Sequence, residues 1–439
     1  MDSLVSRILG HTKDDEMEGN QNYLEKNQEV ILKNPHSWNS AIGAFLQDPT
    51  KCTMGAIWIA AIRSQEKEDS PVEGTIATTE RLIMLGNYKQ MFGFKATLKR
   101  WRMLLHAYAT LCRQMGAHRR GIWWLRLAHT KFSPNECYLT PAAPDVIMLA
   151  LKGNNVQVAT ALLDKPILEV DPTATGVDAT DYMAYYYYGG IAYTVKKDWK
   201  AAKRCLESAL RVPGHASSQI MVEAYKVYLL VGLISEGRAL PVPQNTPYSV
   251  ERSLKQMCSE YWEYAQACEN GDLQKMQAVI DENQKQFRND HLKGLLAQCR
   301  NSVVQNSIAK LTKVYVTLSI AQMAKNVNVS EAEVQAILVG MIEDGSLNAT
   351  ISRQGGMVSF HDEASSTIEE AEVRVTRLRE LAQRIEDLDE NVSLSQPYLL
   401  DKLRANPNYR QIMSDFEAKR KAARGVTGMV SDFLRGPGH

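Results

Sequence analysis

Residues 311–362 read LTKVYVTLSIAQMAKNVNVSEAEVQAILVGMIEDGSLNATISRQGGMVSFHD and carry the start signals of two short helices. Ser319 precedes one apolar run and has Gln322 three residues later. Ser330 precedes a second run and has Glu333 in the same place. In such a capping box, the two side chains bond to backbone N–H groups that a helix end leaves unpaired. The sequence therefore predicts helices that begin directly after Ser319 and Ser330.

The second predicted helix and the residues after it follow the pattern of a helix and a β-hairpin. The helix places its apolar residues on one face, at Val334, Ile337, Leu338, Met341 and Ile342, and Gly345 is positioned as its stop. Apolar residues then alternate at Leu347, Ala349 and Ile351, Gly355 and Gly356 form a turn, and alternation resumes at Val358 and Phe360. Two helices followed by a hairpin predict a winged helix over residues 311–362.

Charge separates the two usual roles of a winged helix, which are DNA reading and protein assembly. A DNA reader needs Lys or Arg on the helix that enters the groove, because phosphate neutralisation supplies most of the affinity. Residues 330–345 contain four acidic residues and no Lys or Arg, and the predicted wing offers only Arg353. The pattern favours an assembly module.

The composition fits a large protein without a strong charge preference. The chain has 439 residues, so several domains or a repeat array are expected, and 51 Lys and Arg residues balance 50 Asp and Glu residues. Its seven cysteines are scattered without the spacing of a zinc ribbon or a redox pair. The first 20 residues lack a signal-peptide core, and no apolar run reaches the ~18 residues of a membrane span. We expect a soluble protein of the cytoplasm and nucleus.

Most of the chain before residue 311 has the pattern of paired helices. In residues 185–214, Gly190, Tyr193, Ala202, Leu206 and Ala209 lie at the offsets of a tetratricopeptide repeat (TPR). One such pair cannot bury its apolar face alone, so neighbouring pairs are implied. Weaker patterns predict further helices over residues 98–127, 145–163, 221–234, 254–267 and 292–304.

The C-terminal part has a different pattern. Residues 367–392 are highly charged and place Leu378, Leu381, Ile385, Leu388 and Val392 at alternating spacings of three and four. This seam of about two heptads predicts a helix that docks either onto partner helices or back onto its own domain. Residues 393–439, which include Lys419, Arg420 and Lys421, are predicted to form a mobile basic tail.

Signals of catalytic chemistry are absent from the sequence. No two of the nine histidines have the spacing of a metal pair, and there is no P-loop and no G-x-S-x-G motif. We therefore predict no enzyme activity, no catalytic residues, no metal and no cofactor. Arg119, Arg120, Trp123 and Trp124 could bind nucleic acid, but packing within a helix pair is the favoured interpretation.

Three segments resemble subunits of the PCI family, in particular those of the COP9 signalosome. They are YYYYGGIAYTVKKDWKAA at 185–202, LTKVYVTLSIAQMA at 311–324 and MIEDGSLNATISRQGGMVSFHD at 341–362. The resemblance implies a mainly α fold, in which a TPR-like helical-repeat array runs into a winged-helix PCI domain and a C-terminal helix follows. The corresponding domains are residues 1–200 for the repeat arm, 201–365 for the PCI domain, 366–392 for the helix and 393–439 for the tail.

The resemblance also implies a function and partners. The chain would be a non-catalytic scaffold of the complex that removes Nedd8 from cullin-RING ubiquitin ligases, adjacent to subunits 1 and 8. Wing strands at 347–352 and 357–361 would form an open sheet edge for a neighbour, and the C-terminal seam would join a helix bundle. The predicted interface residues are Leu347, Ala349, Ile351, Val358, Phe360, Leu378, Leu381, Ile385, Leu388 and Val392.

Two alternatives share parts of this pattern. A PCI scaffold of the proteasome lid or of a translation-initiation complex would have the same architecture and differ in its partners. A PCI-type nucleic-acid adaptor is suggested by the basic tail and by the Arg and Trp residues at 119–124.

Overall fold

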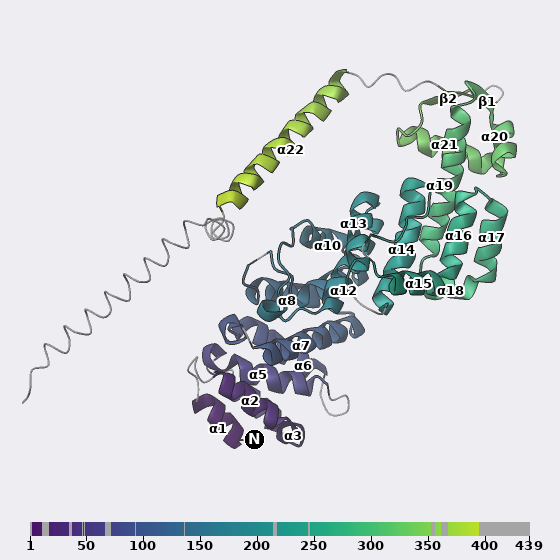
Figure 1. The fold of residues 1–439 in the computed structure, drawn as a ribbon. Helices are drawn as coiled ribbons and strands as arrows, with labels where there is room; N and C mark the ends of the chain where they lie inside the picture. The colour runs from purple at the N-terminus through teal and green to yellow at the C-terminus, as the bar shows by residue number, and fades with distance from the viewer. Residues whose placement is uncertain are drawn as a thin grey trace, which may run out of the picture. The chain divides into compact units, whose positions relative to one another are not determined.

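A computed structural model describes residues 2–394, except residues 11–16, 35–36, 46, 48, 66–71, 93, 136, 214–216, 245, 353–355 and 361–367. The described part is mainly helical, with three short strands near its end (Figure 1). The predicted basic tail lies outside the described residues. Helix α22 (Ile368–Leu394) belongs to a separate compact unit and is described by itself.

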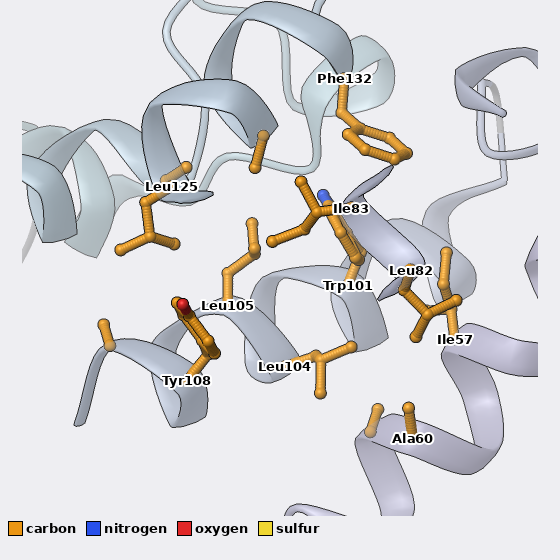
Figure 2. Close-up of a cluster of buried hydrophobic side chains, with 14 of the residues drawn as sticks. Ile57, Ala60, Leu82, Ile83, Trp101, Leu104, Leu105, Tyr108, Leu125 and Phe132 are labelled. Atoms are coloured by element: carbon orange, nitrogen blue, oxygen red, sulfur yellow. The ribbon is translucent and has the colours of Figure 1, made fainter. Parts of the chain in front are cut away.

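The N-terminal helices form the start of the first hydrophobic core. They are α1 (Asp2–Gly10), α2 (Met17–Lys26), α3 (Gln28–Leu32), α4 (Trp38–Phe45), α5 (Pro49–Arg63), α6 (Val72–Leu85) and the 3₁₀ helix η3 (Tyr88–Gln90). Helix α5 packs on α4, α6 and α7, and its residues Ile57 and Ala60 are buried. Figure 2 shows these two side chains facing Leu82, Trp101 and Leu104 from the neighbouring helices.

The predicted helix pairs follow in the expected order. They are α7 (Lys95–Gln114) with α8 (His118–Lys131), α9 (Ala142–Lys152) with α10 (Val156–Leu163), and α12 (Ala179–Val195) with α13 (Trp199–Leu210), while α11 (Pro172–Thr175) is a single turn. The first helices of successive pairs also pack on one another, α7 on α9 and α9 on α12, as stacked repeats require.

The pair α12 and α13 confirms the repeat pattern residue by residue. A Cβ atom on Gly190 would lie 2.6 Å from two side-chain carbons of Leu206, so only glycine permits the observed helix separation. Tyr193, Ala202 and Ala209 are buried between the helices. The start of α12 is fixed by a capping box between Asp178 and Asp181.

Helices α14 to α19 continue the array with two departures from the prediction. They are α14 (Gln219–Glu236), α15 (Tyr248–Met257), α16 (Ser259–Glu269), α17 (Leu273–Glu282), α18 (Gln284–Asn289) and α19 (Lys293–Thr312). The single element predicted at 254–267 is two helices, because the backbone leaves helical geometry at Cys258. Helix α19 is longer than predicted and extends into the segment assigned to the winged helix.

Two hydrophobic clusters meet at α12. One contains buried residues from α1 to α12, and the other contains residues from α12 to α19. Tyr185 contributes to the first cluster and Met183 to the second. The domain boundary proposed at residue 200 therefore lies close to the change of core, but it falls within the first turn of α13 and would separate this helix from α12, on which it packs.

The winged module consists of β1 (Thr317–Ser319), α20 (Ile320–Val327), α21 (Glu331–Glu343), β2 (Ala349–Ile351) and β3 (Met357–Phe360). Gly345 ends α21 with a φ of +68°, and Gly356 lies before β3 with a φ of +58°. Strand β1 was not predicted. It pairs with β3, so the sheet has the order β1-β3-β2.

Candidate interaction surfaces

The two predicted serine caps of the winged module are present, but the reciprocal half of each capping box is replaced. Ser319 accepts a hydrogen bond from the backbone N–H of Gln322 at 3.3 Å, and Ser330 accepts one from that of Glu333 at 3.4 Å. The Gln322 side chain, rather than bonding to the backbone N–H of Ser319, accepts a hydrogen bond from the Ser319 hydroxyl. Glu333 pairs with Arg300 of α19, so its carboxylate ties α21 to the helical array.

The sheet corrects the predicted position of the open edge. Strand β3 lies between β1 and β2, so its backbone groups are used on both sides and 357–360 is not an edge, while His361 lies outside the described residues. Strand β2 is an edge, as predicted for 347–352. The bond from Ser352 N–H to the Met357 carbonyl pairs these two residues. Alternation along an antiparallel ladder then directs the N–H and C=O groups of Ala349 and Ile351 outward.

Three of the predicted interface side chains belong to the interior of the chain. Ala349, Val358 and Phe360 are at most 8% exposed, so they cannot meet a neighbour without unfolding of the module. Leu347 and Ile351 are half-buried. An interface on this edge stays a prediction, and it would have to use backbone groups and Ile351 rather than the three buried side chains.

The predicted seam on α22 is an exposed stripe. Leu378, Leu381, Ile385, Leu388 and Val392 are between 49% and 66% exposed. Val375, which the sequence analysis missed, continues the stripe by one helical turn and is 46% exposed. Apolar side chains repeated along one face of a helix are typical of a helix that packs on others.

The exposed face of α21 remains acidic in the structure. Glu331 stands in its first turn, and the helix has no Lys or Arg. Arg353 of the predicted wing lies outside the described residues. The charge pattern therefore continues to favour a protein partner over nucleic acid for this helix.

The described residues contain no cluster of three or more His, Cys, Asp or Glu side chains that could hold a metal. Among them there is also no helix long and apolar enough to span a membrane. Burial raises the pKa of Cys205 to about 11 and the pKa values of Cys258 and Cys268 to about 12. These thiols are therefore protonated at neutral pH and are poor nucleophiles.

A polar cluster that the sequence analysis did not find joins α7, α9 and α12. His106 Nδ1 lies 2.6 Å from Asp145 Oδ2, and His106 Nε2 lies 2.9 Å from Asp181 Oδ1. Arg102 donates to the other oxygen of Asp181 at 2.7 Å. Because carboxylates occupy both ring nitrogens, the imidazole has no nitrogen left for a substrate. The cluster acts as a clamp between repeats.

The clamp predicts a specific pH dependence of stability. Burial alone would lower the pKa of His106, but the hydrogen bonds to Asp145 and Asp181 outweigh it and raise the pKa to about 10. The unfolded value is near 6.5, so the stabilisation is complete below that pH and is lost as the pH rises through 10. We expect the thermal unfolding midpoint to fall by at least about 2 °C more between pH 7 and pH 10 in the native chain than in His106→Gln. If the unfolding midpoints of the two proteins fall in parallel with pH, His106 does not stabilise the fold through these two aspartates.

Comparison with known proteins identifies relatives of both parts of the array. The family model described as COP9 signalosome complex subunit 3, N-terminal helical repeats, matches residues 14–250, and the PCI domain model matches residues 274–362. A Dictyostelium discoideum protein named COP9 signalosome complex subunit 3 is 31% identical over 300 residues, which cover 67% of this chain and 72% of the relative. A Drosophila melanogaster protein of the same name is 29% identical over 285 residues, covering 60% of this chain and 64% of the relative, slightly less than two thirds of its length.

Proposed function

The chain belongs to the family of COP9 signalosome subunit 3, and on that premise we propose that it is a non-catalytic scaffold subunit of this complex. In this proposal, the removal of Nedd8 from cullin-RING ubiquitin ligases is a property of the assembly. The observation that carries the proposal is the exposed apolar stripe of α22. Burial of such a stripe against partner helices is favourable by ~25 cal/mol for each Å² of apolar surface removed from water.

The edge strand β2 supplies a second contact in the proposal. Its outward N–H and C=O groups can pair with a strand of a neighbouring winged helix, which lengthens the sheet across the subunit boundary. By analogy with the family, the proposed neighbours are signalosome subunits 1 and 8. The proposed location is the cytoplasm and nucleus, which fractionation of cells that express the tagged chain would test.

Affinity purification of the tagged chain, followed by mass spectrometry, tests the function. We expect the other signalosome subunits and cullins to be recovered in amounts comparable to the chain. Recovery of proteasome-lid or translation-initiation subunits instead would keep the fold and overturn the proposed function. Retention of the chain mainly by nucleic acid, lost with rising salt, would support the adaptor alternative.

Ile351→Pro tests the strand edge. Proline removes the one N–H that Ile351 directs outward, and because that group does not pair with β3, the ladder within the module is kept. We expect recovery of the adjacent winged-helix subunit to fall about threefold to tenfold. This corresponds to the net ~1 kcal/mol that one intermolecular hydrogen bond contributes. Ile351→Val, which keeps the N–H and an apolar side chain, is the control. Equal recovery with the proline and valine variants would rule out strand pairing at β2.

A further inference from the structure

Helix α8 carries an exposed stripe that the proposed function does not use. Arg119, Trp123, Arg126 and Thr130 follow one another at spacings of four, three and four residues, so they share one face of the helix. Trp123 is 60% exposed, whereas Leu125 and Ala128 on the other side of the helix are buried. A tryptophan this exposed is unusual for a helix that packs within a repeat array.

The stripe lies beside a short outer helix of the next pair, α10, whose N-terminal side contributes Asn155. Helix α8 has 14 residues and packs on α6, α7 and α9, while α10 has only eight residues and packs on α9 and α12. Between them lies a hollow of about 530 Å³, lined by Arg119, Trp123, Arg126, Leu127 and Asn155, among others. A second hollow of about 410 Å³ shares Arg119, Ile122 and Asn155 with it, so the two form one trough.

The trough is positively charged. Among the described residues, no acidic side chain lines either hollow. Arg120 is neutralised by Glu80, with its Nη2 at 2.7 Å from Glu80 Oε2. Arg119 and Arg126 make no ion pair with any described residue. Two uncompensated guanidinium groups therefore flank one exposed indole and the apolar side chains of Ile122 and Leu127.

We propose that this trough binds an extended acidic peptide segment, with carboxylates on Arg119 and Arg126 and an apolar side chain between them on Trp123. Arg119 and Arg126 are seven residues apart on one helix face, a separation of roughly 10 Å. Side chains three residues apart in a polyproline II segment lie on one face at about 9 Å. The recognised pattern is thus two acidic residues separated by two others, one of them apolar or aromatic.

A peptide fits the trough better than a nucleic acid does. Nucleic-acid sites usually neutralise a row of phosphates and stack bases on flat aromatic faces. Here only two cations are uncompensated, and Trp123 stands edge-on to Trp124 with an interplanar angle of 87°. The remainder of the lining combines aliphatic side chains, such as Ile122 and Leu127, with polar ones, such as Asn155, and this mixture suits both the side chains and the backbone of a peptide.

The test measures binding of a fluorescein-labelled peptide, Pro-Glu-Phe-Pro-Glu-Pro, to the full-length chain by fluorescence anisotropy. We expect a Kd of about 0.1–1 mM, as is usual for a few exposed contacts. Arg119→Glu with Arg126→Glu should weaken binding more than tenfold, and Trp123→Ala should weaken it about fivefold to tenfold. A probe with glutamine in place of both glutamates should bind at least tenfold more weakly.

The control is Arg252→Glu with Arg288→Glu, which changes the net charge equally at two exposed arginines of α15 and α18. All four arginines are exposed, so both double variants should fold. A thermal unfolding midpoint equal to that of the native chain will verify this. Unchanged binding in the α8 double variant, no binding by the native chain, or tighter binding of a 15-nucleotide DNA strand than of the peptide would each overturn the proposal.

Discussion

Ile385→Asp with Leu388→Asp is expected to release the chain from the proposed complex. These side chains are 66% and 62% exposed in the isolated chain, so the substitutions leave the helix itself unharmed. In a helix bundle the same positions would be buried, and two unpaired carboxylates would then have to lose their hydration. Loss of hydration costs several kcal/mol for each buried carboxylate. We therefore expect recovery of partner subunits to fall more than a hundredfold.

A control on the opposite face of α22 separates burial from charge. Arg379→Gln with Gln383→Asp also lowers the net charge by two and lies about half a turn away from the stripe. Quantitative mass spectrometry of tagged chains should show full incorporation of this control and loss of the stripe variant. If both variants are incorporated equally, α22 does not join a bundle through this face.

Local patterns could be predicted from the sequence because neighbouring residues determine them. The serine caps of α20 and α21 and the Gly345 stop depend on residues within one turn of each helix end. The seam of α22 likewise follows from spacing along a single helix. The repeat pair α12 and α13 was found because its contact residues recur at fixed offsets.

Features that depend on distant residues could not be predicted in this way. The order of the sheet rests on pairing of β1 with β3, about 40 residues further along the chain, and β1 is too short to show an alternating pattern. His106 meets Asp145 and Asp181 only because three repeats stack, and the aspartates are 39 and 75 residues away in sequence. Glu333 has the spacing of a capping box, but its ion pair with Arg300 was decided by packing.

The exposed tryptophan of α8 illustrates the same limit on a surface. The spacing of Arg119, Trp123 and Arg126 is visible in the sequence, and it is compatible with either a packed or an exposed face. Its exposure depends on how the helices of the next pair, α9 and α10, pack beside α8. Whether a stripe is core or surface is therefore a property of neighbouring repeats rather than of the helix that carries it.

Gly190→Ala is expected to destabilise the repeat array, although alanine is the better helix former. In an exposed helix this exchange stabilises by ~0.5–1 kcal/mol. At Gly190 the added Cβ would lie 2.6 Å from both Cγ and Cδ2 of Leu206, and Leu206 is fully buried. Overpacking of this kind typically costs ~1–3 kcal/mol, so the sign of the effect reverses. Gly190→Val adds two methyl groups at the same contact and should cost ~3 kcal/mol or more.

The same exchange at Gly340 provides a matched comparison. Gly340 lies within α21, and a Cβ there would meet no atom within 4 Å. Gly340→Ala should therefore stabilise its helix by the ordinary ~0.5–1 kcal/mol. Amide hydrogen exchange in α13 and α21, followed by mass spectrometry, resolves the two sites separately, and it should show faster exchange in α13 for Gly190→Ala and slower exchange in α21 for Gly340→Ala. Because both exchanges change the unfolded chain in the same way, a shared sign would mean that the α12–α13 contact does not require glycine. Opposite signs would establish that the close approach of these two helices, rather than helix propensity, selects the residue at 190.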